Sequence, residues 1–552
     1  MSAPGYQVLA EAFVAEGVET VFALTGDGNM HWEAAFSSAP GRSTVHVRHE
    51  HCACAMASAF ARVTGNVGVA SVTCGPGLTQ TMTALATATQ AQIPLVVFAG
   101  EGPMHTGWYN QAIEQGPLVT ATGARYIPVH SRKRLQQAVT DAFHYARTQR
   151  RPVVLGVPFD LQQELVHPVP QYVPSVDYLP QIGPRSPHPE FLQAAVGRIL
   201  AARRIVILAG RGAARAGAQQ ACLELAELCN AALATTLPVR GLFAGSDRDI
   251  GVAGGFAHPV TAQAFAASDL VIAVGAGLNG YTTDGGKLIR PDLVLQIDDE
   301  PPSFVQGRKV ADQVLAADAR LAISALTSAL SASKAKWSNW GVVEFARRIR
   351  SAPVDTHDYP VPDGTTDPRE VIRVLDSELP RDWNYVNGSG HSSFFSVHMF
   401  DRPADRFLTV REFGPIGNGL SYAIGMAAAR ADRPTVLLEG DGGLMMHAQE
   451  LETVQRYGWK LLLCILNDGA FGSEIHKLRA DGVSDHGAIY GRSDLARMAE
   501  GFGLRGVRVT DVNQLPELIG QFKEADRAML LDIQVSDQVI SPRMLKAISG
   551  RK

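Results

Sequence analysis

The stretch from Thr435 to Lys477 constrains the fold of this chain more strongly than any other segment. An apolar run, Thr435 to Leu438, ends in Gly440-Asp441-Gly442-Gly443; a helical pattern follows, and a second apolar run, Leu461 to Leu466, ends in Asn467-Asp468-Gly469. A strand, a helix and a second strand in this order predict a parallel βαβ unit. Both turns then lie at the carboxyl edge of one sheet, which is where such sheets bind ligands.

Two acidic residues, Asp441 and Asp468, occupy these turns. Each alone suits an ordinary turn or helix cap, because aspartate favours both. Together, beside a glycine turn that lets a phosphate approach the backbone at a helix N-terminus, they offer hard oxygen ligands for Mg²⁺ or Ca²⁺. The pair therefore indicates a cation that bridges to a diphosphate.

The same order of elements occurs near the N-terminus. A helix of small residues precedes a strand from Gly68 to Thr73, a glycine turn at Gly75, a helix and a second strand from Pro94 to Ala99. We infer two copies of one α/β unit, of which only the second has the aspartate of Gly-Asp-Gly and can hold the metal. Glu50 opens the small-residue helix, a position that the helix dipole alone also favours for an acid.

Two stretches without helix or strand patterns divide the chain. Prolines dominate from His167 to Pro189, and Ser333 to Asp367 is the second predicted linker. Helix and strand patterns alternate between them, but the Gly210-Arg211-Gly212 turn lacks the third glycine of a dinucleotide fingerprint. We predict an α/β fold of three doubly wound domains with parallel sheets, at residues 1–166, 190–332 and 368–552.

Composition limits the class of protein. The chain has 552 residues, 46% hydrophobic and 19% charged, which is typical of a soluble globular protein with several domains. Its net charge of −4 lacks the basic excess that nucleic-acid binding requires. No apolar run reaches the ~20 residues that span a bilayer, and no secretory signal is found, so we expect a cytoplasmic protein without a membrane partner. The six cysteines are predicted to be buried thiols.

These motifs resemble those of thiamine-diphosphate (ThDP)-dependent enzymes, in the group of acetolactate synthase, benzoylformate decarboxylase and benzaldehyde lyase. The resemblance covers essentially the whole chain in family order. The metal motif in this chain is the Gly-Asp-Gly turn followed by Asn467-Asp468. Asp468 stands where the family usually has a second asparagine, so it keeps an oxygen ligand and adds a charge. The resemblance implies Mg²⁺ bound by Asp441, Asp468 and the carbonyl of Ala470.

The stretch VRHEHCACAMASAFARVTG is similar to the first-domain signature of the family. This similarity implies that Glu50 hydrogen-bonds N1′ of the aminopyrimidine ring and favours the 4′-imino tautomer, which takes the C2 proton of the thiazolium. It also implies that Ile416 forces ThDP into a V shape and that the Gly414 carbonyl accepts from the 4′-amino group. The resemblance implies further cofactor contacts at Gly75, Gly390, His391, Ser392, Gly440, Gly442, Gly443, Phe471 and Gly472. Of these, His391 and Ser392 would donate hydrogen bonds to the diphosphate.

Three residues at strand ends of the first domain are candidates for the substrate side. Gln111 matches an active-site glutamine of the family's carboligases, and Asp27 lies where its decarboxylases keep an acid for proton transfer. His105 is a polar group in the same loop as Gln111, and both are equally consistent with solvated loop residues. The paired histidines of pyruvate decarboxylase are not found, which disfavours that subfamily.

In acetolactate synthases and pyruvate oxidases, the middle domain holds FAD. Here Leu278-Asn279-Gly280-Tyr281 replaces the flavin-contacting Arg-Phe-Asp-Asp motif typical of acetolactate synthase, so a structural middle domain is expected and FAD is the alternative. The resemblance further implies a homodimer or homotetramer in which Glu50 and the metal loop of one site come from different subunits.

The leading hypothesis is an enzyme that acts on a small-molecule substrate with ThDP and Mg²⁺. It decarboxylates a 2-oxo acid and/or transfers the resulting acyl-anion equivalent to an aldehyde or ketone. A flavin-linked oxidoreductase of the pyruvate oxidase type and a ThDP-binding protein without catalysis are the alternatives. The sequence does not determine the donor and acceptor.

Overall fold

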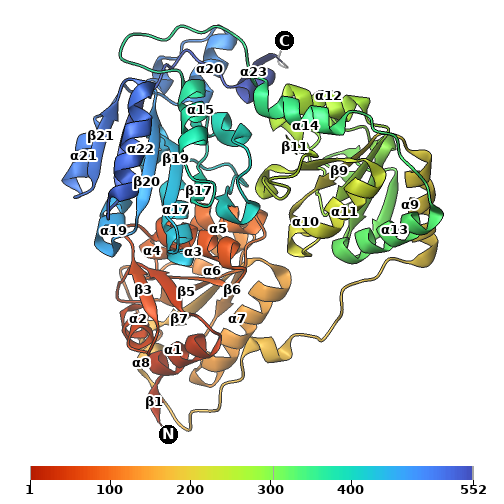
Figure 1. Cartoon of the computed structure of the whole chain (residues 1–552). Helices are drawn as coiled ribbons and strands as arrows, with labels where there is room; N and C mark the ends of the chain where they lie inside the picture. Colours follow the sequence, from red (N-terminus) through yellow and green to blue (C-terminus); the bar gives the residue numbers. More distant parts are fainter. Residues whose placement is uncertain (1, 303, 550–552) are drawn as a thin grey trace.

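The structure, a computed structural model, describes residues 2–302 and 304–549. The described chain forms three α/β units, each built on a six-stranded sheet whose paired strands are all parallel. Figure 1 shows the N-terminal unit in red and orange, the central unit in yellow and green to one side, and the C-terminal unit in blue. The predicted fold class, α/β with three parallel-sheet domains, is confirmed.

The N-terminal sheet has the strand order β3-β2-β4-β5-β7-β6. Strands β4, β5 and β7 are buried along nearly their whole length, as their continuous apolar runs predict for parallel strands covered on both faces. Its strands are β2 (Thr20–Ala23), β3 (Ser43–His46), β4 (Gly68–Val72), β5 (Leu95–Glu101), β6 (Arg125–Pro128) and β7 (Pro152–Pro158). Its helices are α1 (Gly5–Ala15), α2 (Met30–Ser37), α3 (Glu50–Thr64), α4 (Pro76–Thr79), α5 (Met82–Gln90), α6 (Gln115–Ala121), α7 (Leu135–Gln149) and α8 (Phe159–Gln163).

The C-terminal sheet has the order β18-β17-β19-β20-β22-β21, which is the N-terminal order repeated strand for strand. This shared topology agrees with the predicted duplication. Its strands are β17 (Asn384–Asn387), β18 (Phe407–Leu408), β19 (Thr435–Gly440), β20 (Leu461–Asn467), β21 (Arg505–Val509) and β22 (Met529–Gln534). Its helices are α15 (Pro368–Glu378), α16 (Ser392–Phe395), α17 (Gly419–Ala429), α18 (Asp441–Met446), α19 (Glu450–Tyr457), α20 (Gly472–Ala480), α21 (Leu495–Gly501), α22 (Leu515–Glu524) and α23 (Pro542–Ser549). The single helix expected after Asp441 is thus two helices.

The central sheet has the order β11-β10-β9-β12-β13-β16. Its strands are β9 (Ile205–Ala209), β10 (Ala232–Thr235), β11 (Asp249–Val252), β12 (Leu270–Val274), β13 (Val294–Asp298) and β16 (Gln313–Ala316). Its helices are α9 (Pro189–Ala201), α10 (Arg211–Arg215), α11 (Gln219–Cys229), α12 (Pro259–Ala267), α13 (Ala319–Ser333) and α14 (Val342–Ser351). Two antiparallel pairs complete the described strands: β1 (Ala3–Pro4) with β8 (Leu165–Val166), and β14 (Phe304–Val305) with β15 (Arg308–Lys309).

Helix α14 differs from the prediction, because it lies in the stretch expected to be the second linker. Val342, Ala346 and Ile349 recur at helical spacing and are buried. Val342 and Ala346 join an apolar cluster of the central unit, so this helix covers that unit rather than connecting two domains. The polar residues on its other face explain why the sequence indicated a linker.

Helices α3 and α17 join the N-terminal and C-terminal units. A Cβ at Gly425 would lie 2.3 Å from the carbonyl oxygen of Met56, so the two helices approach at backbone distance. Buried residues of both units form one continuous apolar cluster around these helices. Small residues on both helices therefore let the two homologous units pack closely.

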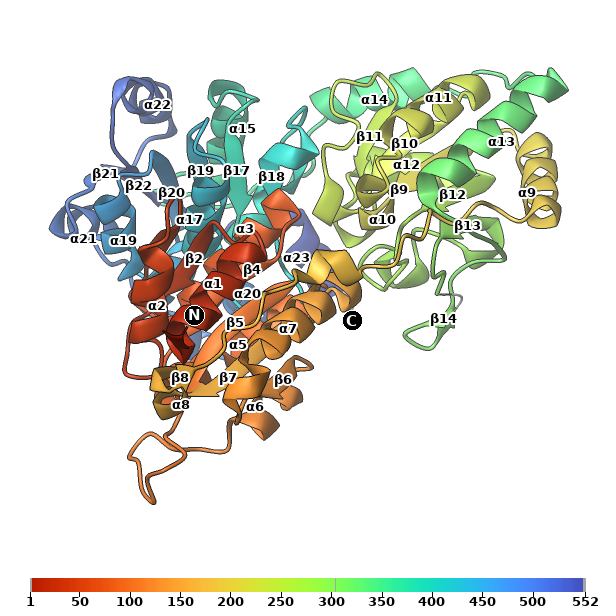
Figure 2. The same cartoon turned by 90° about the horizontal axis from the view of Figure 1, so that it is seen from below.

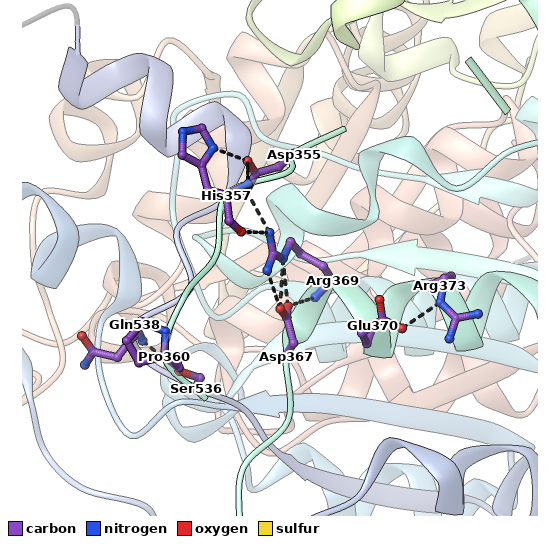
Figure 3. Close-up of polar contacts among 9 residues, drawn as sticks. All are labelled: Asp355, His357, Pro360, Asp367, Arg369, Glu370, Arg373, Ser536 and Gln538. Carbon is purple, nitrogen blue, oxygen red and sulfur yellow. Dashed lines mark hydrogen bonds and ion pairs between the residues drawn. The ribbon is translucent and has the colours of Figure 1, made fainter. Parts of the chain in front are cut away.

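Two connecting segments are anchored by buried acids. Between the first two units, the Glu16 carboxylate accepts hydrogen bonds from the Tyr172 hydroxyl (2.6 Å) and the Ser175 amide (2.7 Å). Before α15, Arg369 donates hydrogen bonds to both Asp355 and Asp367, as Figure 3 shows. These contacts fix the approach of the chain to α15.

All six cysteines are free and buried, as predicted. Within residues 2–302 and 304–549, no helix is both long enough and apolar enough to span a membrane.

Candidate functional site

The two predicted metal-site acids lie together. Strands β19 and β20 are adjacent and in register, with Gly440 opposite Leu466, so their following turns meet. Asp441 begins α18, and its Oδ2 accepts the Gly469 amide at 3.0 Å; Asp468 Oδ1 accepts the Ala470 amide at 3.1 Å. The sheet geometry thus brings both carboxylates to one point, as the sequence predicted.

Burial and mutual repulsion make it costly for both acids of this pair to be charged. Burial raises the pKa of Asp441 to about 6. Burial and the neighbouring Asp441 charge raise the pKa of Asp468 well above its ordinary value. Two buried carboxylates side by side must share a proton or bind a positive charge. The predicted third ligand, the carbonyl of Ala470, accepts the Tyr490 hydroxyl at 3.1 Å and keeps a second lone pair.

A cavity of about 550 Å³ opens beside the two acids. A Cβ at Gly442 would lie 2.6 Å from the Tyr490 hydroxyl, and one at Gly472 would lie 2.7 Å from Asp468 Oδ2, so the cavity needs bare backbone at both positions. Its walls include twelve of the predicted cofactor and metal residues: Gly390, His391, Ser392, Ile416, Gly440, Asp441, Gly442, Gly443, Asp468, Ala470, Phe471 and Gly472. This surface suits a metal-bound phosphate group.

His391 has a defined tautomer. Its Nε2 accepts the Ser541 amide at 2.9 Å, which places the ring proton of the neutral imidazole on Nδ1. A Cβ at Gly472 would lie 2.9 Å from that Nδ1, so the N–H faces the cavity wall and is placed to donate to an anion. Ser541, in a segment that contributed no motif to the sequence analysis, therefore orients this donor.

The start of α15 and the segment after β22 form part of the cavity rim. Pro368 and Ser536 line the cavity, and the Ser536 hydroxyl donates to the Pro360 carbonyl at 2.7 Å, as Figure 3 shows. Gly414 lies outside these walls: it is exposed with a φ of +75°, and no described atom lies within 4 Å of the Cβ position. Its predicted contact with the cofactor therefore stays a prediction.

The buried Glu439, which sequence analysis missed, lies behind the cavity. A Cβ at Gly419 would lie 1.8 Å from Glu439 Oε2, and one at Gly388 would lie 2.4 Å from Oε1. The backbone amides of Gly419, Gly440 and Ser389 approach the carboxylate and favour its charged form, but burial outweighs them. Burial raises the pKa of Glu439 to about 8, so the group is largely protonated at neutral pH. In the sequence, the available signal for Glu439 was its position as an acid at the end of an apolar run.

Glu50 lies in the other half of the predicted site. It begins α3 and is half-buried, and burial raises its pKa. A Cβ at Gly77 would lie 3.4 Å from Glu50 Oε1. Gly75 has a φ of +56°, and a Cβ there would lie 2.1 Å from the Gln111 carbonyl oxygen. The backbone of Gln111 therefore occupies the space beside the turn after β4. The corresponding turn after β19 faces the cavity instead.

Two of the three predicted substrate-side residues lie together. The Tyr109 hydroxyl lies 3.2 Å from Gln111 Oε1 and 3.4 Å from Asp27 Oδ2. His105 is not part of this group: its side chain is 73% exposed and lies 3.5 Å from Glu164. The segment that carries it projects away from the N-terminal unit in Figure 2.

Gln115 organises this half of the site and was missed by sequence analysis. Its Oε1 accepts the Gly75 amide at 2.9 Å, and its Nε2 donates to the Gly100 carbonyl at 3.0 Å. It is buried, so it fixes the Gly75 turn against the end of β5. Its position as a second glutamine in the Gln111 loop was the available signal.

Glu50 and Gly75 lie outside the walls of this cavity. Those walls come from Pro368 to Val539.

The glycine turns of the central unit pack against each other. A Cβ at Gly210 would lie 2.3 Å from the Gly275 carbonyl oxygen, and one at Gly275 would lie 2.2 Å from the Ala213 amide. Arg211 pairs with Glu412 at 2.7 Å. Close backbone packing therefore accounts for these glycines without a bound nucleotide.

Comparisons with known proteins agree with this arrangement. Family models match at residues 4–115 (thiamine pyrophosphate enzyme, N-terminal TPP binding domain), 192–326 (central domain) and 388–533 (C-terminal TPP binding domain). The chain is 27% identical to the acetolactate synthase isozyme 3 large subunit of Escherichia coli, over 96% of this chain and 94% of the relative. It is 27% identical to the acetolactate synthase large subunit of Corynebacterium glutamicum (97% and 87%) and 28% identical to acetolactate synthase 2, chloroplastic, of Zea mays (97% and 86%). With all three domains matched in order, the chain belongs to the thiamine pyrophosphate enzyme family.

Proposed function

We propose that this protein is a ThDP- and Mg²⁺-dependent enzyme that breaks or forms carbon–carbon bonds. It decarboxylates a 2-oxo acid and/or transfers the acyl-anion equivalent to an aldehyde or ketone, in the manner of the acetolactate synthases that it resembles. The observation that carries this proposal is the buried pair Asp441 and Asp468 beside a glycine-lined cavity, because a bound cation would let both carboxylates ionise and would bridge them to a diphosphate.

The residues present fit the cofactor and its metal. Asp441, Asp468 and the Ala470 carbonyl would hold Mg²⁺, since this ion prefers oxygen ligands and bridges readily to phosphates. The Nδ1–H of His391 and the hydroxyl of Ser392 would donate to the diphosphate. When bound, ThDP supplies a carbon nucleophile that adds to the donor carbonyl and then accepts the electrons released with CO₂.

Glu50 would act at the aminopyrimidine ring. Its partial burial raises its pKa, which suits a carboxyl group that shares a proton with N1′. Because Glu50 is absent from the cavity walls of its own chain, we propose that each site combines the cavity of one subunit with Glu50 of the partner subunit. The minimal active species is then a homodimer, and a homotetramer would contain two such dimers.

The substrate side would be formed by the polar group around Tyr109. Asp27 and Gln111 both approach its hydroxyl, so a carbonyl or carboxyl substrate would meet donors and an ionisable acid there. Asp27 would hold or deliver a proton, and Gln111 would orient the substrate. His105 would need a different loop conformation to reach the same place, because it now lies beside Glu164.

The decisive experiment combines a substrate panel with one conservative variant. The purified protein, with ThDP and Mg²⁺ added or withheld, is given 2-oxo acids with and without aldehyde acceptors, and CO₂ and products are measured. Glu50→Gln should remove turnover while leaving ThDP bound, because glutamine keeps a hydrogen bond but cannot shift the tautomer. Glu224→Gln, on the exposed surface of the central unit, is the matched control. Full activity of Glu50→Gln would refute the assignment.

We also propose that the enzyme works without FAD. The glycine turns of the central unit are used for packing between β9 and β12, and Arg211 is paired with Glu412. The visible absorption spectrum of the purified protein tests this directly, since a flavin chromophore would favour the oxidoreductase alternative.

A further inference from the structure

A second cavity, of about 380 Å³ and partly open to solvent, lies between the central and C-terminal units. From the central unit its walls include Thr235, Arg240 and Asp249, and from the C-terminal unit His398, Asp401 and Arg402. None of these residues belongs to the ThDP site described above. The cavity is therefore a separate feature at a domain boundary.

Arg240 is a buried cation without a direct partner in this cavity. It is 6% exposed, and neither Nη atom has a hydrogen-bond partner among residues 2–302 and 304–549. Its guanidinium carbon lies 5.0 Å from the centre of the Phe407 ring, which is its one aromatic contact in that part of the chain. Burial lowers the pKa of Arg240 only to about 10, so the group stays charged at neutral pH.

The carboxylates nearby are engaged elsewhere. Asp376 pairs with Arg381 and Arg402, and Asp401 pairs with Arg350 at 3.2 Å. Asp249 accepts the Gly251 amide at 2.8 Å and forms no ion pair with Arg240.

The charge balance of the cavity follows from these pairings. Four arginines (Arg240, Arg350, Arg381 and Arg402) face three carboxylates (Asp249, Asp376 and Asp401), so one positive charge is left over even when Asp249 is ionised. An unpaired charge in a buried place is unfavourable, so the positive charge of Arg240 calls for an anion.

We propose that this cavity binds a small oxyanion, a carboxylate or inorganic phosphate, through the two Nη groups of Arg240. The guanidinium fork matches two oxygens of either group, and charged hydrogen bonds of this kind are the strong ones. His398 lies in the same wall. The inference goes beyond the proposed function and does not depend on it.

The oxyanion would hold two units together close to the cofactor site. Gly241, the next residue after Arg240, has a φ of +84°, and a Cβ there would lie 1.9 Å from the Arg402 carbonyl oxygen. The segment 396–402 continues directly from α16, which begins at Ser392 in the wall of the first cavity. Binding at Arg240 thus acts on the chain that leads to the diphosphate-side loop.

The test uses the whole protein saturated with ThDP and Mg²⁺, so that the first cavity is filled. In a buffer free of phosphate and carboxylates, inorganic phosphate and acetate are added separately while the thermal transition and the heat of binding are measured. We expect saturable binding of phosphate, acetate or both. Comparing their affinities shows whether the cavity prefers a phosphate or a carboxylate. Arg240→Leu should weaken that binding by about tenfold or more, because it removes both donors.

Two further variants make the result specific. Arg240→Lys keeps the charge without the fork and should bind more weakly than the wild type. Arg248→Leu removes a partly buried arginine that hydrogen-bonds Asn230 outside the cavity, and it should bind normally. Without added anion, Arg240→Leu should melt at or above the wild-type temperature. No saturable binding by the wild type, or unchanged binding by both Arg240 variants, would overturn the proposal.

Discussion

Replacing Asp468 with asparagine should change how metal binding depends on pH. In the metal-free protein, burial raises the pKa of both acids, and the Asp441 charge raises that of Asp468 further, so we expect the pair to keep one proton between them. Mg²⁺ must displace that proton before both oxygens can bind it. Asparagine resembles the protonated acid but has no proton to lose.

The magnitude follows from one proton released per metal bound. Above about pH 6, the affinity of the wild type for Mg²⁺ should rise ~10-fold per pH unit, which is ~1.4 kcal/mol, until Asp468 ionises. Asp468→Asn should lack this rise. The variant then binds Mg²⁺ about as well as the wild type near pH 6 and increasingly worse at higher pH, because it has one charge fewer.

The assay is a Mg²⁺ titration at fixed, saturating ThDP, followed by calorimetry or intrinsic fluorescence at several pH values. Ionisation of ThDP itself affects both proteins equally, so the ratio of the two affinities is the readout. Asp526→Asn, which changes a side chain that is 98% exposed, should behave as the wild type. A ratio that stays constant from about pH 6 to 8 would refute the shared-proton argument.

Two further changes test the surroundings of the cavity. Burial raises the Glu439 pKa from 4.5 to about 8, so this carboxyl group stabilises the fold most at low pH, and its contribution falls as pH rises from 4.5 to about 8. Urea unfolding of Glu439→Gln should be less sensitive to pH in that window; an unchanged pH dependence would contradict the burial of the charge. Gly472→Ala would put a methyl group 2.7 Å from a metal-site carboxylate oxygen, and ThDP affinity should fall about tenfold or more. Gly520→Ala, where no described atom lies within 4 Å, should leave affinity unchanged.

Local sequence patterns were sufficient to predict the sheets and the acid pair. Apolar runs that end in glycine turns specify parallel strands, and the adjacency of β19 and β20 then forces Asp441 and Asp468 together. The strands and the acid pair could be predicted because each turn directly follows its strand in the sequence. The repeated order of elements also indicated the duplication, which the matching strand orders support.

Contacts between distant segments could not be predicted in the same way. Ser541 fixes the His391 tautomer across 150 residues, and Tyr490 reaches the Ala470 carbonyl from a loop that has no motif of its own. The unpartnered Arg240 is recognisable only when both units are placed, because an arginine after a strand is unremarkable in a sequence. Such features depend on packing, which a single sequence does not specify.

The duplication leads to a prediction about assembly. The N-terminal copy holds Glu50, but its glycine turn is closed by the Gln111 backbone; the C-terminal copy has the open turn with Asp441. Chains of Glu50→Gln and of Asp441→Ala should each be inactive alone. Mixed one to one and allowed to exchange subunits, they form hybrid dimers with one intact site, so activity should recover to about a quarter of the wild type. If both halves acted within one chain, the mixture would stay inactive, and the proposed shared site would be wrong.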